Sequence, residues 1–150
     1  MEYRDLMMIE YVNFIGLTEL DSSNSLRLSF DRYEASHTPE PFQLSDDVIL
    51  PETYPIESTK APIIQLDFES YIGYSVINES FTSWDEYERF EGKKTFRIYS
   101  KSRFLDYISN ATFAIQEYPG PYLHYGIVCL DHIVNVVTIS EPKVREINRQ

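Results

Sequence analysis

Residues 122–140, YLHYGIVCLDHIVNVVTIS, constrain the fold more than any other part of the chain, because they form its most apolar stretch. They follow the sequence PGP at 119–121, which neither continues a helix nor fits a central strand. Val, Ile and Tyr dominate the stretch, and these residues favour strands. A turn at its polar interruption, Asp131-His132, predicts a hairpin with strands at about 122–130 and 133–139. Since apolar residues fall on both faces of the second strand, we expect the centre of a sheet there.

Alternation of apolar and polar residues predicts further strands on both sides of the chain's midpoint. It is clearest at 26–30, 64–68 and 96–98, and residues 71–78 continue the pattern. Residues 6–33 are predicted to form two long strands, joined by the turn sequence DSSN at 21–24. Phe14 and Ile15 break the phase of the first strand, and Gly16 predicts a bulge there.

Residues 100–111 carry the strongest helix pattern. Phe104, Leu105, Ile108 and Ala111 form one apolar stripe, and Ser100 or Ser102 supplies an N-cap. With many strands, short connections and one main helix, the sequence predicts an α+β fold. We expect an antiparallel sheet, strongly curved or partly closed, with the helix packed on it.

Two segments break these patterns. Residues 34–62 contain five of the eight prolines, with six acids and one base, and predict a long proline-rich acidic loop inside a single domain spanning 1–150. The tail, 141–150, is polar and predicts a short helix or a frayed end.

Residues 83–92, SWDEYERFEG, admit two structures. Capping-box spacing and aromatic residues at every third position favour a short helix. Alternatively, a turn at 91–93 joins residues 87–90 to 94–99 as a hairpin, with acids across from Lys94 and Arg97. The clean alternation after the turn favours the hairpin.

The formal net charge of −11 is concentrated in one part of the chain. Residues 1–91 contain 19 acids and 5 bases, whereas residues 92–150 contain 5 acids and 8 bases. A field of this sign repels phosphate backbones, so direct nucleic-acid binding is not expected, and it attracts a basic protein partner. The competing interpretation is that the charge only maintains solubility.

The chain also lacks signals for secretion, membrane insertion or disulfide pairing. Acids flank Arg4 near the N-terminus, and no apolar run approaches the about 20 residues of a membrane helix. The single Cys129 fits a reducing compartment. We therefore expect a cytoplasmic protein without membrane contact.

Candidate catalytic groups lie close together in sequence, but they are not expected to meet in space. His124 and Cys129 have opposite strand parity, so they point to opposite faces, and the hairpin turn cannot return His132 as far as His124. The chain has no glycine-rich phosphate loop, G-x-S-x-G, H-E-x-x-H or C-x-x-C. We expect no enzymatic activity, no cofactor and no metal site.

Binding has a stronger candidate around Trp84. This aromatic residue lies among Asp85, Glu86 and Glu88, a combination suited to a basic partner. The competing interpretation is a buried Trp beneath a solvated charged surface. A basic run follows, and its competing interpretation is pairing with these acids: Lys93, Lys94, Arg97, Lys101 and Arg103.

The runs FRIYSKSRFLDYI (96–108) and HYGIVCLDHIVNVVTISEP (124–142) resemble small stand-alone cytosolic proteins of Gram-positive bacteria. Some of those proteins look like immunity proteins of polymorphic toxin systems. The resemblance implies a non-enzymatic protein that binds and blocks a toxin domain, and an acidic inhibitor suits a basic toxin.

The predicted partner site consists of Trp84, Asp85, Glu86 and Glu88, extended by Asp46 and Asp47 of the proline-rich loop. The alternative function is a small-molecule-binding or hydrolytic domain, with a pocket lined by Tyr and holding His124 or His132.

Overall fold

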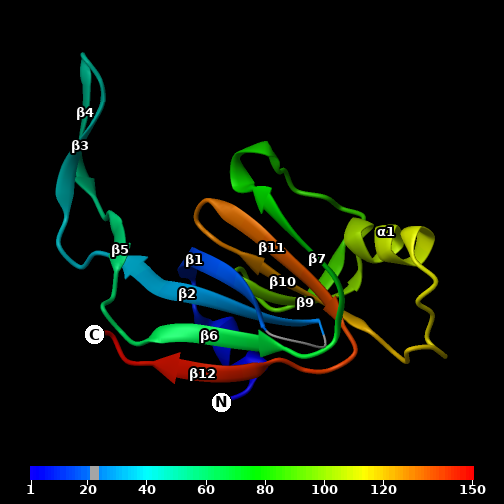
Figure 1. Cartoon of the computed structure of the whole chain (residues 1–150). Helices are drawn as coiled ribbons and strands as arrows, with labels where there is room; N and C mark the ends of the chain where they lie inside the picture. The colour runs from blue at the N-terminus through cyan, green and yellow to red at the C-terminus, as the bar shows by residue number, and fades with distance from the viewer. Residues whose placement is uncertain (21–23) are drawn as a thin grey trace.

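The computed structural model describes residues 1–20 and 24–150, and it contains two antiparallel sheets packed face to face (Figure 1). The predicted α+β class is confirmed, since antiparallel strands are combined with one main helix. The strongly curved or partly closed sheet is wrong, because both sheets are open. Each sheet covers the apolar face of the other, so burial of these faces needs no closure.

The first sheet has the strand order β1-β2-β6-β12, and β5 pairs with the end of β2. The strands are β1 (Tyr11–Leu20), β2 (Ser25–Ala35), β5 (Ile56–Ser58), β6 (Ile63–Phe68) and β12 (Lys143–Ile147). Strand β12 corrects the prediction of a helical or frayed tail: its backbone pairs with β6, and Val144 packs against the core.

The second sheet has the order β7-β11-β10-β9-β8. Its strands are β7 (Tyr71–Asn78), β8 (Arg89–Glu91), β9 (Phe96–Lys101), β10 (Leu123–Val128) and β11 (His132–Thr138). The predicted hairpin is β10–β11, and both of its strands have neighbours on either side. This apolar stretch therefore lies in the interior of its sheet, as predicted.

Aromatic residues join the two sheets across the core. Phe30 of β2 meets Phe96 of β9 at 6.0 Å between ring centroids, and Phe68 of β6 meets Tyr125 of β10 at 5.7 Å. A 3-10 helix, η1 (Tyr3–Met8), closes one end of this core with the fully buried Tyr3. Residues 6–8 were therefore wrongly predicted as strand.

Local predictions in the two hairpins are largely confirmed. The β1–β2 register shifts between Phe14 and Gly16, which is the predicted bulge, whereas residues 21–23 of the predicted turn lie outside the described residues. Residues 83–92 contain a hairpin strand rather than the helix, but only β8 (Arg89–Glu91) pairs with β9, and residues 92–95 connect them instead of the predicted turn at 91–93. Its acids do not face Lys94 and Arg97: Glu91 is opposite Ile98 and forms a salt bridge with Arg4.

Helix α1 (Arg103–Ala111) packs on the outer face of the second sheet. The Ser102 hydroxyl accepts a hydrogen bond from the Leu105 amide at 3.0 Å and caps the helix. Ile108 is buried, and its Cδ1 lies over Gly73 of β7, where a Cβ atom would be only 2.7 Å away. Gly73 thus permits the close approach of helix and sheet.

The region predicted as a long loop contains a hairpin of β3 (Glu40–Ser45) and β4 (Val48–Thr53), followed by β5. Residues 40–53, called the arm below, project away from the sandwich (Figure 1). Prolines at 41 and 51 led to the prediction of a loop. They are tolerated here because both strands of a two-stranded ribbon are edge strands.

Candidate functional site

Three of the predicted site residues come together around one hollow on the outer face of the second sheet. Trp84, Asp85 and Glu88 line a cavity of about 300 Å³, called the Trp84 pocket below. They belong to the segment that follows η2 (Glu79–Phe81) and leads into β8. Strands β9, β10 and β11 and helix α1 complete the walls, so residues far apart in sequence share this pocket.

The side of the pocket next to the sheet is aromatic. Tyr99 of β9 and His124 of β10 are direct cross-strand neighbours, and their rings stack with centroids 4.3 Å apart and planes 14° apart. Gly126 makes this possible: a Cβ atom there would lie 2.5 Å from Cε2 of Tyr99. Phe104 of α1 meets His124 edge-on at 5.5 Å.

His124 is held by a continuous chain of hydrogen bonds. The Asn135 amide donates to Ser75 Oγ at 3.2 Å, which turns its carbonyl oxygen toward His124 Nε2 at 2.7 Å. Nε2 therefore carries the proton, and Nδ1 accepts from the Ser102 hydroxyl at 2.7 Å. Burial lowers the pKa of His124 to about 4, opposed by the hydrogen bond to Asn135, so the ring is neutral at neutral pH.

The hydrogen-bonded series Ser102, His124 and Asn135 resembles a catalytic nucleophile, base and orienting group, but its geometry does not support hydrolysis. Both nitrogens of His124 are occupied, and Ser102 is fully buried while its oxygen caps α1. A substrate in the pocket therefore has no access to the hydroxyl that a general base would activate. The arrangement fixes the orientation and tautomer of the His124 ring.

Trp84 stands at the edge of the pocket with 72% of its surface exposed, which contradicts the interpretation of a buried Trp. Its ring is 6.4 Å from that of Phe90, which also lines the pocket.

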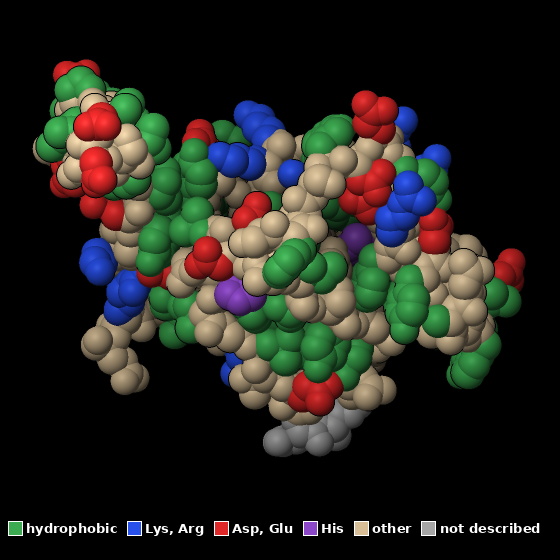
Figure 2. Space-filling model, turned by 90° about the horizontal axis from the view of Figure 1, so that it is seen from above, with side chains coloured by type: hydrophobic (Ala, Val, Ile, Leu, Met, Phe, Trp, Pro, Cys, Tyr) green, Lys and Arg blue, Asp and Glu red, His purple; other side chains and the backbone are tan. Residues whose placement is uncertain are grey.

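The acids around Trp84 have basic neighbours. Asp85 forms a salt bridge with Arg103 at 3.1 Å, and this contact, with a hydrogen bond from the Tyr87 amide, lowers the pKa of Asp85. Glu88 accepts a hydrogen bond from the Arg103 amide at 3.2 Å, at the start of α1. Figure 2 shows acidic and basic side chains intermixed beside α1. The acidic field expected around Trp84 is therefore offset at Asp85, whereas Glu86 and Glu88 have no salt bridge among the described residues.

The basic run packs mainly on aromatic rings. Lys94 lies over Tyr11, Arg97 over Phe90, and Lys101 over Tyr87. Of the five bases in the run, only Arg103 pairs with one of the preceding acids in the described salt bridges.

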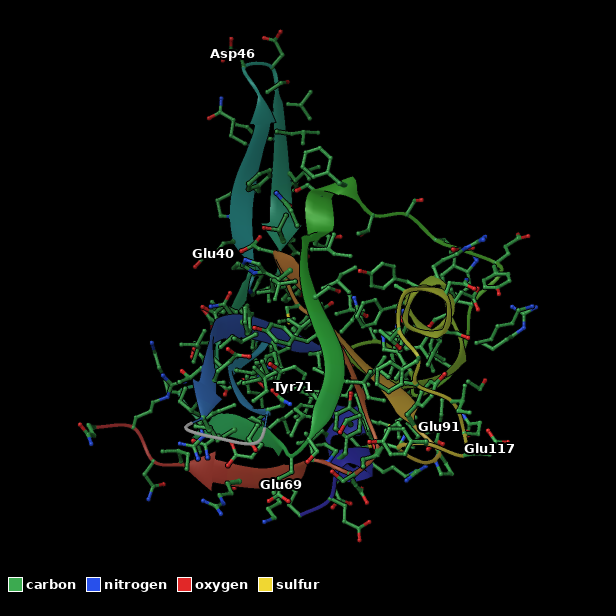
Figure 3. The ribbon with its side chains drawn as sticks, turned by 45° about the vertical axis from the view of Figure 1, so that its right-hand side comes forward. Glu40, Asp46, Glu69, Tyr71, Glu91 and Glu117 are labelled. Carbon is green, nitrogen blue, oxygen red and sulfur yellow. The ribbon has the colours of Figure 1, made fainter. Side chains whose placement is uncertain are left out.

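The remaining predicted residues lie elsewhere. Glu86 is exposed beside the pocket, whereas Asp46 and Asp47 lie at the tip of the arm, which projects away from α1. Figure 3 shows Asp46 at this tip and Glu40 near the base. The predicted site thus divides into two separate surfaces.

The arm is almost entirely exposed, including its apolar side chains. Leu44 and Ile49 are exposed by 63% and 61%, and the cross-strand pair Phe42 and Leu50 is also exposed. Within the described residues, none of the arm's four acids forms a salt bridge. In Figure 2 the arm, at the upper left, shows hydrophobic and acidic side chains.

Cys129 and His132 do not join the Trp84 pocket. Cys129 is a free, buried cysteine of the core, and burial raises the pKa of its thiol. His132 packs edge-on against Phe14 at 5.3 Å. Residues 1–20 and 24–150 contain no group of three or more His, Cys, Asp or Glu side chains placed to hold a metal ion.

Comparisons with known proteins identify no relative: no protein-family model, curated protein or solved structure matches the chain. The part of the chain that the structure describes has no helix of the length and apolar character needed to cross a membrane.

The alternative hypothesis of a Tyr-lined pocket holding His124 or His132 correctly named His124, but sequence reasoning missed its neighbours in the floor of the pocket: Arg97, Tyr99, Phe104 and Asn135. A signal was present in the alternation of β9, because Phe96 and Ile98 point inward and Arg97 and Tyr99 must then point outward. The register that places Tyr99 against His124 is not encoded locally.

Proposed function

We propose that the protein is a non-enzymatic module that binds a basic protein, and that the arm is its main contact surface. One observation carries this proposal: the hairpin of the arm presents exposed apolar side chains, and all of its charged residues are acidic. Residues 36–59 contain five acids and no Lys or Arg.

An arm of this kind gains stability from a partner. An isolated two-stranded hairpin is at best marginally stable in water, and contiguous exposed apolar surface is typical of interaction sites. A partner that covers Phe42, Leu44 and Ile49 would remove that surface from water. Both outer edges of the arm also present backbone groups to which a partner strand can add.

The charge of the arm defines the partner's chemistry. Carboxylates without basic neighbours attract a cationic surface and accelerate association, chiefly at low salt. The apolar side chains between them then supply the short-range contact.

Inhibition of a basic toxin domain is the specific form of this function that the resemblance to immunity proteins implies. The net charge of −11 and the exposed acidic arm agree with it. That Trp84, Asp85, Glu86 and Glu88 contact the same partner stays a prediction, and the salt bridge of Asp85 with Arg103 makes this surface the weaker candidate.

The alternative function divides into two parts. Hydrolysis through His124 is disfavoured, because both ring nitrogens are engaged. Binding of a small molecule is favoured by the cavity of about 300 Å³ beside His124.

The test begins by examining whether a reading frame next to this one encodes a basic protein, and then expresses that protein. Cells expressing that protein should stop growing and should recover when this chain is co-expressed. The double variant Phe42→Ser/Leu50→Ser should fail to restore growth, because it removes the apolar contact. Phe113→Ser, at an exposed position outside the arm, is the matched control and should restore growth.

A kinetic measurement separates charge from apolar contact. Reversing Asp46 and Asp47 to Lys should lower the association rate about tenfold at low salt, with a smaller difference at high salt. The same reversal at Asp85 and Glu86 tests the Trp84 surface. Association that is unaffected by salt, by the Asp46/Asp47 reversal and by the Phe42/Leu50 double variant would refute the arm as the contact surface.

A further inference from the structure

Five aromatic rings form an unbroken series along the Trp84 pocket. The distances between consecutive ring centroids are 6.4 Å for Trp84 and Phe90, 5.3 Å for Phe90 and Tyr99, 4.3 Å for Tyr99 and His124, and 5.5 Å for His124 and Phe104. All five side chains line the cavity. Faces and edges of this kind favour a flat aromatic guest, which can stack on one ring and meet another edge-on.

The cavity also limits the size of the guest. Its volume of about 300 Å³ lies at the lower end of the range for small-molecule sites, about 300–1,000 Å³. It accommodates one or two fused rings with a short substituent.

The charges of the pocket favour an anionic substituent. Asp85 and Arg103 offset each other in their salt bridge, and Glu88 is engaged at the positively polarised start of α1. Arg97 differs: it donates to the Lys94 carbonyl at 2.9 Å and the Tyr99 hydroxyl at 3.1 Å, both neutral oxygens. Among the described residues it has no salt-bridge partner, so its charge is available to a ligand.

We propose that the Trp84 pocket binds a small aromatic carboxylate, with the ring against the exposed Trp84, over the buried Tyr99–His124 pair, and the carboxylate on the Arg97 guanidinium. Hydrogen bonds with Ser102 and Asn135 hold the buried imidazole of His124 in place, so it offers a ligand no free nitrogen. The site corresponds to the alternative function, binding of a small molecule, and is independent of the arm.

Trp84 is the only tryptophan of the chain and stands at the pocket, so its fluorescence reports occupancy directly. The probe is phenylacetate, added at constant ionic strength near physiological, where the long-range field of the net charge is screened. A ligand of this size should bind with a dissociation constant on the order of 1–10 mM. We expect a saturable change in Trp84 fluorescence and saturation transfer from the protein to the phenyl protons.

Two matched probes test the two recognised groups. Cyclohexylacetate keeps the carboxylate but lacks the aromatic ring, and phenethylamine keeps the ring but reverses the charge. Each should bind at least about fivefold more weakly than phenylacetate. Equal binding of cyclohexylacetate would refute recognition of the ring, and tighter binding of phenethylamine would refute recognition of the carboxylate.

Variants assign the site. Arg97→Gln should weaken phenylacetate binding about tenfold, as expected for loss of a charged hydrogen bond. Trp84→Ala should also weaken phenylacetate binding, as measured by saturation transfer, and because Trp84 is 72% exposed the fold should be retained. Phe81→Ala is the control: Phe81 is 87% exposed, close to Trp84 in sequence, and outside the pocket lining.

The arm variant Phe42→Ser/Leu50→Ser should bind phenylacetate normally, so failure of this proposal and failure of the proposed function are distinguishable. Absence of saturable binding up to about 50 mM, or binding that Trp84→Ala and Arg97→Gln leave unchanged, would overturn the proposal.

Discussion

The arm and the sandwich are both built from antiparallel strands rich in apolar residues, but they differ in what covers them. In the sandwich, Phe30 and Phe68 of the first sheet are fully buried against the second. In the arm, Phe42 and Ile49 remain exposed, although the backbone pairing of β3 and β4 is of the same kind.

The difference shows that strand pairing alone does not define the role of an apolar residue. Burial of a large apolar side chain contributes about 1.5–3 kcal/mol, which the sandwich gains on folding. The arm has not gained it, so the corresponding free energy is available on association with a partner. Apolar residues of the sandwich therefore determine stability, whereas those of the arm contribute little to it and are the ones assigned to binding under the proposed function.

The largest effect is expected in the sandwich. Phe68→Ala should lower the free energy of unfolding by about 3–5 kcal/mol, because it removes a fully buried ring that contacts Tyr125. Urea denaturation followed by circular dichroism measures the change. A loss below about 1 kcal/mol would mean that the two sheets do not share a tightly packed core.

An intermediate effect is expected on the outer face of the second sheet, where the pocket and α1 cover His124. Its pKa of about 4 lies below the usual 6.5, so the unfolded state takes up the proton first as pH falls. The stabilisation is complete above about pH 6.5 and is lost between 6.5 and 4, with a total of about 3 kcal/mol.

Denaturation curves at pH 7 and pH 4.5 test this, with His124→Gln as the control. The variant cannot titrate at this position, so its stability should fall less over the same interval. Parallel pH profiles of the two proteins would contradict a buried, neutral His124.

The smallest effect is expected in the arm. Phe42→Ala should change the free energy of unfolding by less than about 0.5 kcal/mol, because the side chain is already exposed in the folded protein. The same denaturation experiment measures it beside Phe68→Ala. A loss of more than 1 kcal/mol would show that the arm packs on the sandwich in solution and would remove the contrast between the two regions.

Local signals in the sequence predicted most of the individual elements. Alternation located β2, β6 and β9, and the Ser102 cap with its apolar stripe located α1. The division into two sheets was not predictable, because it depends on which strands pair over long separations. Strand β12 was missed for a related reason: it is an edge strand with only two apolar residues, and its pairing with β6 defines it.

The candidate site was less predictable than the fold. The cluster at Trp84 was identified from its local sequence, but the charge of its surroundings depends on Arg103, which α1 places beside Asp85. Likewise, His124 was correctly separated from Cys129 by strand parity, while its contacts with Ser102 and Asn135 arise from tertiary packing. A charge count along the chain therefore overestimated the acidity of this surface and gave no indication of the arm's isolation.

The way the arm is attached has an evolutionary consequence. It is inserted between β2 and β6, which are hydrogen-bonded neighbours, and its two ends meet where the Ser36 amide donates to the Pro55 carbonyl at 2.8 Å. Residues 37–54 are thus an insertion whose two ends lie together between paired strands of the first sheet. Insertions and exchanges are well tolerated at such positions. An exchange of residues 37–54 as a unit would therefore alter the exposed surface of the arm while leaving the pairing of β2 with β6 and the sandwich unchanged.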